Sequence, residues 1–182
     1  MADSRYTIME TSLGPFWIWG APAGVCGAGF GSEIRPRDLR RLCRYGIETP
    51  LRISDPNADA LLQEAVTEVQ AYFASKLQVF TVPIDLRGTP FQLAVWEHLI
   101  GVPYGKTRSY GEIALELENA QASQAVGQAV GANPVALIVP CHRIVGHDGG
   151  LTGYAGGVER KAALLELESY GYQLPMPELP QR

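Results

Sequence analysis

The stretch LIVPCHRIVG, residues 137–146, joins an aliphatic run to a polar cluster. Residues 135–139 are aliphatic and predict a short buried strand, which Pro140 ends because proline cannot donate to a strand ladder. A cysteine and a histidine follow directly. Cys141 can be a small residue that fills the core, or a nucleophile whose proton His142 accepts. Neighbouring residues of a strand point to opposite faces, so the second interpretation requires a turn after Pro140 or a bridging water.

The nucleophile interpretation also needs a group that holds the imidazole ring. A cysteine at its unperturbed pKa of about 8.5 is mostly a neutral thiol at neutral pH, so a base must take its proton. A carboxylate would orient that base, and Glu166 and Glu168 on the last predicted helix are the candidates. A lone Cys-His pair is more often structural. These residues alone therefore leave both interpretations open.

The composition is that of a globular protein. The chain has 182 residues, of which 46% are hydrophobic and 19% charged, enough for one large domain or two small ones. No apolar run approaches the length of a membrane span, and the first 13 residues lack the pattern of a signal peptide. Three cysteines without paired spacing argue against a disulfide framework. We expect a cytoplasmic protein, or a nuclear one in a eukaryote, that does not bind membranes.

The net charge of −4 is unfavourable for a protein that binds nucleic acid through a cationic face. Residues 90–170 contain five basic side chains against eight acidic ones. A DNA footprint there would consist of small residues, main-chain amides and helix N-termini. The densest basic stretch is expected to be a solvated loop or helix face with some ion pairs, and it contains Arg35, Arg37, Arg40, Arg41 and Arg44.

The first half predicts a small antiparallel sheet followed by a helix. Asp55 is the expected N-cap of that helix, with Pro56 at its first position, and apolar residues recur at helical spacing until about Lys76. The segment DLRGTP, residues 85–90, has the Gly and Pro of a connection, so we place a domain boundary there. The expected strands are residues 6–10, 16–19 and 24–31, with a fourth at 79–84 after the helix.

Short helices dominate the second half. Thr89 and Pro90 begin the first, and Ser109 with Glu112 forms a capping box that begins the second. The second and third helices, joined by a tight turn, are a helix-turn-helix candidate, which by itself is a weak signal for DNA binding. The expected helices are residues 90–99, 110–118, 121–131 and 158–168.

A series of motifs in this half resembles the O6-alkylguanine-DNA alkyltransferases, also called methylated-DNA–protein-cysteine methyltransferases. The motifs follow one another in the family's order through nearly the whole second half. The first half resembles the family's N-terminal domain more loosely, in SLGPFWIW at 12–19 and GVCGAGF at 24–30. The second-half motifs are PFQLAVW at 90–96, VPYGKTRSYGEIA at 102–114, AVGQAVGANP at 125–134, PCHRIVG at 140–146 and TGYAGG at 152–157, with Lys161 after them.

The resemblance implies an α+β fold. The N-terminal domain, residues 1–86, would be a small antiparallel sheet with a helix and a structural role. Residues 87–172 would form a mostly helical domain like a winged helix-turn-helix, which binds DNA and carries the alkyl acceptor. Residues 173–182 would be a tail.

The resemblance also implies an activity, which is direct reversal of DNA damage. The protein would flip O6-alkylguanine out of duplex DNA and transfer the alkyl group to Cys141, irreversibly and once per molecule. His142 would activate the thiol through a water, and Glu168 would orient its ring. Asn133 would brace the helix pair around the active-site strand. Tyr110 would hydrogen-bond the base and help to protonate the departing guanine.

Further residues are implied for binding. The loop with Tyr154, Ala155 and Gly156 would contact guanine O6, and the main-chain carbonyls of Cys141 and Ile144 would accept from its exocyclic amine. The expected partner is double-stranded DNA that contains O6-alkylguanine, bound by a monomer, with cooperativity along DNA left open. No cofactor is implied. The recognition helix would contact DNA through Ala122, Ser123, Gln124, Gly127 and Gly131.

The sequence departs from the family pattern in two places. Members normally carry an arginine in the recognition helix that enters the stack vacated by the flipped nucleotide, and here Gln124 stands in its place, without a charge. Ala155 replaces a hydroxyl-bearing residue found in some relatives, so one contact to O6 would be missing. Some relatives bind zinc in the N-terminal domain, but Cys26 and Cys43 match no metal-ligand spacing, so we expect no metal.

Three other functions compete with this one. A lesion sensor would flip the base without transferring the alkyl group, but relatives of that kind lack the acceptor cysteine. A hydrolase with a Cys-His-Glu triad would turn over a thioester or peptide. A winged-helix regulator would bind undamaged DNA in a sequence-specific way.

Overall fold

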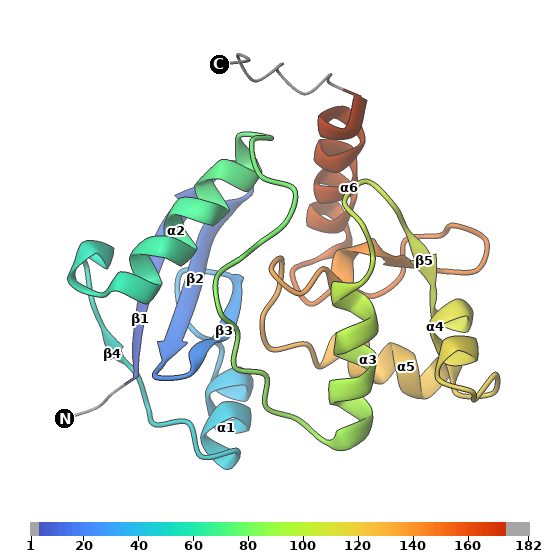
Figure 1. Ribbon diagram of the computed structural model, residues 1–182, viewed down its shortest axis with the longest axis horizontal. Helices are drawn as coiled ribbons and strands as arrows, with labels where there is room; N and C mark the ends of the chain where they lie inside the picture. The colour runs from blue at the N-terminus through green and yellow to red at the C-terminus, as the bar shows by residue number, and fades with distance from the viewer. Residues whose placement is uncertain (1–3, 174–182) are drawn as a thin grey trace, which may run out of the picture.

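The computed structural model describes residues 4–173 and has a sheet half beside a helical half (Figure 1). Strands β1 (Arg5–Thr11), β2 (Gly14–Ala21) and β3 (Gly24–Phe30) form the predicted antiparallel meander. A two-residue strand, β4 (Leu51–Arg52), adds a parallel edge that the sequence did not predict, and the strand order is β3-β2-β1-β4. The expected α+β fold is confirmed.

The sheet is covered on both faces because its central strand alternates large side chains. Phe16 and Ile18 belong to the main core, which also contains residues of the helical half. Trp17 and Trp19 point the other way and pack with Leu42 in a second cluster. A Cβ at Gly29 of β3 would lie 2.8 Å from the Trp17 ring, so this glycine makes room for the indole.

The basic stretch is a helix, α1 (Pro36–Arg44), which surrounds a buried carboxylate. Asp38 is 3% exposed, and its carboxylate pairs with Arg35 at 2.6 Å and with Arg41 at 3.4 Å. A buried carboxylate therefore neutralises part of the positive charge of this basic stretch. Arg41 Nη1 also donates to the carbonyl of Ala132 in the helical half.

The long helix of the first half, α2 (Ala60–Phe73), begins later than predicted. Asp55 does accept from a main-chain amide, that of Asn57 at 3.0 Å, but it caps only a single 3₁₀ turn, η1 (Pro56–Ala58). Asp59 then caps α2 by accepting from Leu62 N at 3.1 Å. The helix ends three residues before Lys76, because Ser75 takes a positive φ of 57°.

The predicted strand at residues 79–84 is wrong. Only an isolated parallel bridge between Val25 and Ile84 is present there. The amides of Thr81 and Val82 donate instead to the carboxylate of Glu68 on α2, at 3.0 and 3.1 Å. Because a side chain satisfies these donors, the two amides need no neighbouring strand, and the segment bends at Val79 and Val82.

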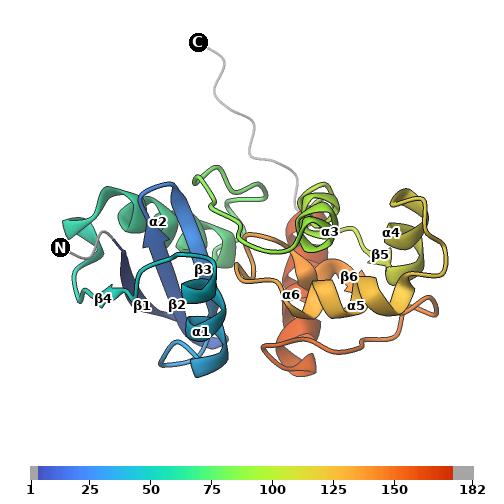
Figure 2. The same ribbon diagram turned by 90° about the horizontal axis from the view of Figure 1, so that it is seen from below.

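The helical half follows the predicted order with adjusted ends (Figure 2). The predicted capping box of Ser109 with Glu112 is present, and Thr89, predicted to begin the first helix, forms a second one with Gln92. The predicted helix 110–118 ends two residues early, and the predicted helix 121–131 begins two residues late. The last helix continues to Gln173, the first residue of the expected tail. Residues 174–182 of that tail lie outside the described part. The elements are α3 (Pro90–Ile100), β5 (Arg108–Ser109), α4 (Tyr110–Glu116), α5 (Ser123–Gly131), η2 (Cys141–Arg143), β6 (Ile144–Val145) and α6 (Val158–Gln173).

The aliphatic run at residues 135–139 is buried but is not the regular strand that we expected. It folds back on itself, with Val139 N donating to Val135 O at 2.9 Å and Leu137 at a φ of 74°. One residue of β3, Ala28, fastens the run to the sheet by donating to Pro134 O at 2.9 Å and accepting from Ala136 N at 3.0 Å. The two halves are thereby joined in one core.

Among residues 4–173, no helix has both the length and the apolar character needed to cross a membrane.

Candidate active site

Cys141 is the first residue of η2, the 3₁₀ turn that follows Pro140. The side chain is buried, with 6% of the residue exposed. Burial raises the pKa of the Cys141 thiol, whereas a hydrogen bond from the Asn133 side chain, the charge of Lys161 and nearby main-chain amides act in the opposite direction. The thiol is therefore protonated at rest in surroundings that can stabilise a thiolate.

Asn133 connects this cysteine to the folded-back aliphatic run. Its amide nitrogen donates to Val139 O at 2.8 Å, and its amide oxygen accepts from Val135 N at 3.0 Å. The same side chain acts on Cys141 by lowering the pKa of its thiol. One buried amide thus fixes both ends of the run that leads to the cysteine.

His142 is fully buried and forms a pair with Glu168 from α6. Its Nε2 lies 2.7 Å from Glu168 Oε1. Burial lowers the pKa of His142, and the hydrogen bond to Glu168 only partly opposes this. An ionised carboxylate can only accept, so the neutral ring carries its proton on Nε2 and leaves a lone pair on Nδ1. Nδ1 has no hydrogen-bond partner among residues 4–173. The ring can therefore act as a base through Nδ1.

Glu168 stays ionised because donors surround it. Burial alone would raise its pKa, but the hydrogen bonds from His142 and Arg143 and the charge of Arg143 keep the pKa of Glu168 low. Arg143 Nη2 lies 3.0 Å from Oε1, and its Nε lies 3.0 Å from Oε2. Gly105 N adds a bond to Oε2 at 3.0 Å, and Tyr72 from α2 donates to Oε1 at 2.7 Å.

Lys161 is a buried lysine next to the cysteine. Its Nζ donates to the carbonyl of Ile144 and, at 2.9 Å, to that of Thr152. Burial lowers the pKa of Lys161, and the neighbouring Cys141 opposes the shift. A cation at this place favours a thiolate on Cys141.

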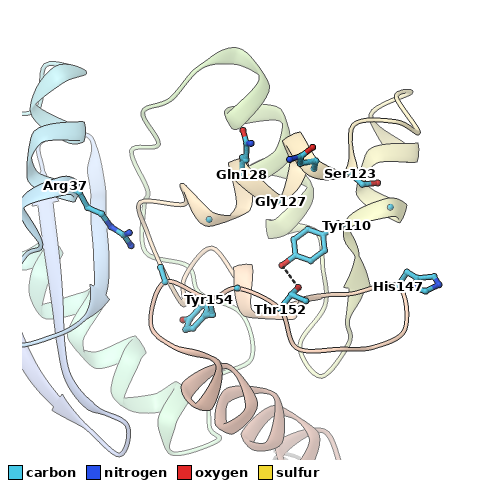
Figure 3. Close-up of a pocket in the computed structure, with 13 residues that line it drawn as sticks. Arg37, Tyr110, Ser123, Gly127, Gln128, His147, Thr152 and Tyr154 are labelled. Atoms are coloured by element: carbon cyan, nitrogen blue, oxygen red, sulfur yellow. Dashed lines mark hydrogen bonds between the residues drawn. The ribbon is translucent and has the colours of Figure 1, made fainter.

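An open hollow of about 800 Å³ lies beside this cluster, between α4, α5 and the loop after β6 (Figure 3). Tyr110 and Thr152 face each other across part of it, and the Thr152 hydroxyl donates to Tyr110 Oη at 3.3 Å. Gly127 of α5 packs against the Tyr110 ring, since a Cβ there would lie 3.7 Å from it. Arg37 reaches the hollow from α1 in the sheet half. The hollow is therefore shared by both halves.

The loop at 152–157 forms one wall of the hollow and is held by arginines. Arg35 Nη1 donates to Ala155 O at 3.0 Å, and Arg160 Nη1 donates to Gly156 O at 2.9 Å. A Cβ at Gly156 would lie 2.7 Å from the Tyr154 ring, so only glycine fits there. Burial, followed by the nearby Cys141, raises the pKa of Tyr154, which keeps its hydroxyl protonated.

The structure brings most of the sequence-predicted residues into two adjoining groups. Cys141, His142, Glu168 and Asn133 form the buried group, with Ile144 buried nearby. Ala122 is buried at the N-cap of α5 and, like Cys141, Ile144 and Gly156, is not among the residues that line the hollow. The predicted residues that do line it are Tyr110, Ser123, Gln124, Gly127, Gly131, Tyr154 and Ala155.

Sequence reasoning missed several polar residues of these groups. Tyr72 looked like one more apolar position of an amphipathic helix, so no local signal pointed to its hydroxyl. Arg143 lies inside one of the motifs and Lys161 follows them. Their sequence context did not indicate that both side chains are buried. The carbonyl of Ile144, expected to accept from guanine, already accepts from Lys161, which leaves one lone pair for a ligand. The hollow is also lined by Arg37, Gln128, His147 and Thr152.

No cluster of three or more His, Cys, Asp or Glu side chains suited to a metal ion exists among residues 4–173.

Comparison with known proteins matches both halves of the chain to one family. Residues 4–86 match the 6-O-methylguanine DNA methyltransferase ribonuclease-like domain, and residues 90–170 match the DNA binding domain of the same methyltransferase. A methylated-DNA–protein-cysteine methyltransferase of Mycobacterium tuberculosis is 56% identical over 165 residues, which is 90% of this chain and 92% of that protein. The inducible counterpart of Bacillus subtilis is 45% identical over 139 residues, 76% of each chain.

Solved structures agree with these sequence matches. The crystal structure of the M. tuberculosis O6-methylguanine methyltransferase superposes with a TM-score of 0.79 at 38% identity and covers 96% of each chain. A crystal structure of the M. tuberculosis protein in complex with DNA gives a TM-score of 0.79 at 40% identity and covers 92% of this chain and 94% of that one. On this sequence, fold and site, the chain belongs to the methylated-DNA–protein-cysteine methyltransferase family.

Proposed function

We propose that the protein repairs DNA by direct reversal, transferring the alkyl group of O6-alkylguanine, mainly O6-methylguanine, to Cys141. One observation carries the proposal. A buried thiol follows a fixed turn, and the next residue is a histidine whose Nε2 is engaged by Glu168 at 2.7 Å while Nδ1 is left with its lone pair. A cysteine nucleophile needs a base that a third group orients, and His142 held by Glu168 provides that base.

The thiol is activated by proton transfer in the proposed reaction. The S–H bond of Cys141 breaks and its proton goes to His142 Nδ1, through a water where the side chains do not touch. The resulting imidazolium is stabilised by Glu168, which remains ionised. Asn133 and Lys161 stabilise the thiolate by a hydrogen bond and by charge. In this proposal the thiolate forms only in the complex with the substrate. In the free protein, the raised pKa keeps the Cys141 thiol protonated and unreactive.

The damaged base is delivered to the cysteine by extrusion from the duplex. A buried thiol cannot reach a carbon inside the base stack, so the nucleotide must rotate into the hollow beside Tyr110 and Tyr154. Extrusion costs roughly a few kcal/mol and costs less for a weakly paired damaged base. The small residues of α5 would let the helix approach the DNA closely, and the Gln124 side chain would enter the vacated space.

The transfer itself is a displacement at carbon. Cys141 Sγ forms a bond to the alkyl carbon, and the bond from that carbon to O6 breaks with its electron pair left on guanine. Because Thr152 donates to Tyr110 Oη, the Tyr110 proton is not used in that bond and can be donated to the departing guanine. Tyr110 then regains its proton, through water, from the His142 imidazolium, so the proton lost by the thiol ends on guanine and the reaction balances. The product is a thioether with no easy route back to a thiol, so each molecule acts once.

Intact-mass measurement tests the proposal. Protein mixed with a duplex that carries one O6-methylguanine is expected to gain the mass of one methylene group and to stop at one methyl group per molecule. Cys141→Ser is the matched control, since Cys26 and Cys43 remain in it. Methylation that persists in Cys141→Ser, or a wild-type protein that binds the lesion and gains no mass, would refute the proposal.

We also propose how the rest of the molecule serves this function. The chain would divide into residues 1–86, which support the site, and residues 87–172, which bind DNA, with a tail at 173–182. A monomer acting in the cytoplasm, or in the nucleus of a eukaryote, fits a repair protein that meets single lesions. Gel filtration with light scattering tests the monomer.

A further inference from the structure

One side chain of the sheet half reaches into the buried catalytic group. Tyr72 lies on α2 and is fully buried. Its hydroxyl donates to Glu168 Oε1 at 2.7 Å and lies 3.5 Å from His142 Nε2. Oε1 is the same oxygen that His142 Nε2 contacts at 2.7 Å. Tyr72 and His142 therefore share one carboxylate oxygen.

The Tyr72 hydroxyl is held in this place by the packing of its ring. The ring stacks on Phe80 with centroids 5.5 Å apart and meets Phe73 and Tyr104 edge to face at 5.5 and 5.9 Å. Burial and the neighbouring Glu168 raise the pKa of Tyr72, so the hydroxyl keeps its proton and remains a donor. A fixed donor on a charged acceptor is a strong hydrogen bond.

The Tyr72 hydroxyl reduces the negative charge that Glu168 presents to His142. Each hydrogen bond to Oε1 withdraws negative charge from it, and a carboxylate with less free charge stabilises an imidazolium less well. Arg143 already neutralises Glu168 in part, and Tyr72 adds to that effect. A His142 ring that protonated at rest would lose the lone pair on Nδ1 and could not take the thiol proton.

We propose that Tyr72 is a positioning residue for alkyl transfer, which holds Glu168 and keeps His142 a neutral base. The inference rests on the proposed function in naming the reaction. A residue of the sheet half would thereby influence the proton transfer, although the acceptor cysteine and its base both lie in the helical half.

The other charged groups around His142 come from different elements and stay in place when the Tyr72 hydroxyl is removed. Glu168 and Lys161 belong to α6, and Cys141 and Arg143 flank the histidine in η2. Tyr104 lies beyond Glu168, with its ring under Arg143 at 5.7 Å. Replacing Tyr72 by phenylalanine therefore removes one donor and keeps the ring.

The pH dependence of methyl transfer in Tyr72→Phe tests this role. The rate with a duplex carrying O6-methylguanine is expected to fall about fivefold to tenfold at neutral pH, and its acidic limb to move upward by about half to one pH unit. The sign follows because a more negative Glu168 raises the pKa of His142. Tyr104→Phe is the control, since it deletes a hydroxyl from the same aromatic cluster, one that bonds Leu167 O and not Glu168. Its profile is expected to match the wild type.

Two further measurements keep the test decisive. Nitrogen-15 NMR of the three histidines, in protein without DNA, reports the protonation of His142 directly and should show the same upward shift in Tyr72→Phe. Site-specific 3-fluorotyrosine at position 72, a stronger donor of nearly the same shape, should move the limb downward. Wild-type transfer combined with unshifted profiles in both variants overturns the inference, whereas absence of wild-type transfer overturns the proposed function itself.

Discussion

Gln124 stands where the family pattern has an arginine. Its side chain is exposed in the first turn of α5 and lines the hollow. A glutamine there can hydrogen-bond the base left unpaired, but it neutralises no phosphate. The helical half has few other cations available for DNA, because Arg143 and Lys161 are buried.

Gln124→Arg is therefore expected to bind duplex DNA more tightly and with a steeper dependence on salt. One added phosphate contact would steepen the slope of log K against log salt by about 0.9. Fluorescence anisotropy with a labelled duplex over a salt series measures both quantities. Gln63→Arg, at an exposed place on α2 away from the hollow, adds the same charge and separates position from net charge. An unchanged affinity and slope in Gln124→Arg would show that the first turn of α5 does not face the backbone or stack of DNA.

At the scale of the element, α1 joins the sheet half to the parts of the helical half that face the hollow. Arg35 donates to the carbonyl of Ala155 in the loop, and Arg41 donates to that of Ala132, just after α5. Asp38 ties these two arginines to each other. The helix thus fixes the distance between the loop and α5.

Arg35→Ala should loosen that loop and slow alkyl transfer by about fivefold, the value of one hydrogen bond of about 1 kcal/mol. Arg40→Ala is the matched control because it removes the same charge from an exposed place on the same helix. Single-turnover rates at saturating DNA separate a slower transfer step from weaker binding. Equal rates for the two variants would argue against a role of α1 in holding the loop.

The elements also show how far the sequence could predict this protein. Capped helices were predicted well, because a capping box such as Ser109 with Glu112 is local and its partners lie three residues apart. Segments 79–84 and 135–139 have the apolar pattern of strands, yet side chains satisfy some of their main-chain groups instead: Glu68, 14 residues before Val82, and the nearby Asn133, six residues before Val139. Pattern alone cannot tell which partner a main-chain amide will find.

The residues of the site also differ in how far the sequence could indicate them. From the residues alone, Cys141 and His142 were plausible and Glu166 was as good a partner as Glu168, so the family resemblance singled out Glu168. The contact at 2.7 Å agrees with that choice. Tyr72 is 96 residues from Glu168 and reaches it only because the sheet half folds against the helical half.

At the scale of the whole molecule, one core runs through both halves, and Cys141 is part of it. An added methyl group on Sγ must fit among packed neighbours, and such overpacking costs about 1 to 3 kcal/mol. The alkylated protein is expected to melt about 2 to 9 °C lower than the unreacted one. Differential scanning calorimetry on both forms measures this, with Cys141→Ser exposed to the same DNA as the control. An equal or higher melting temperature for the methylated protein would contradict the expectation.

The pairing of His142 with a carboxylate 26 residues further along the chain has a consequence for how the protein is made. A growing chain carries Cys141 before it carries Glu168, and the two meet only when α6 packs against η2. Under the proposed mechanism, an unfinished or partly folded chain holds an ordinary thiol. A protein that can act only once therefore gains its reactivity only after the segment that carries Glu168 has been made and has folded, when it can be used on DNA.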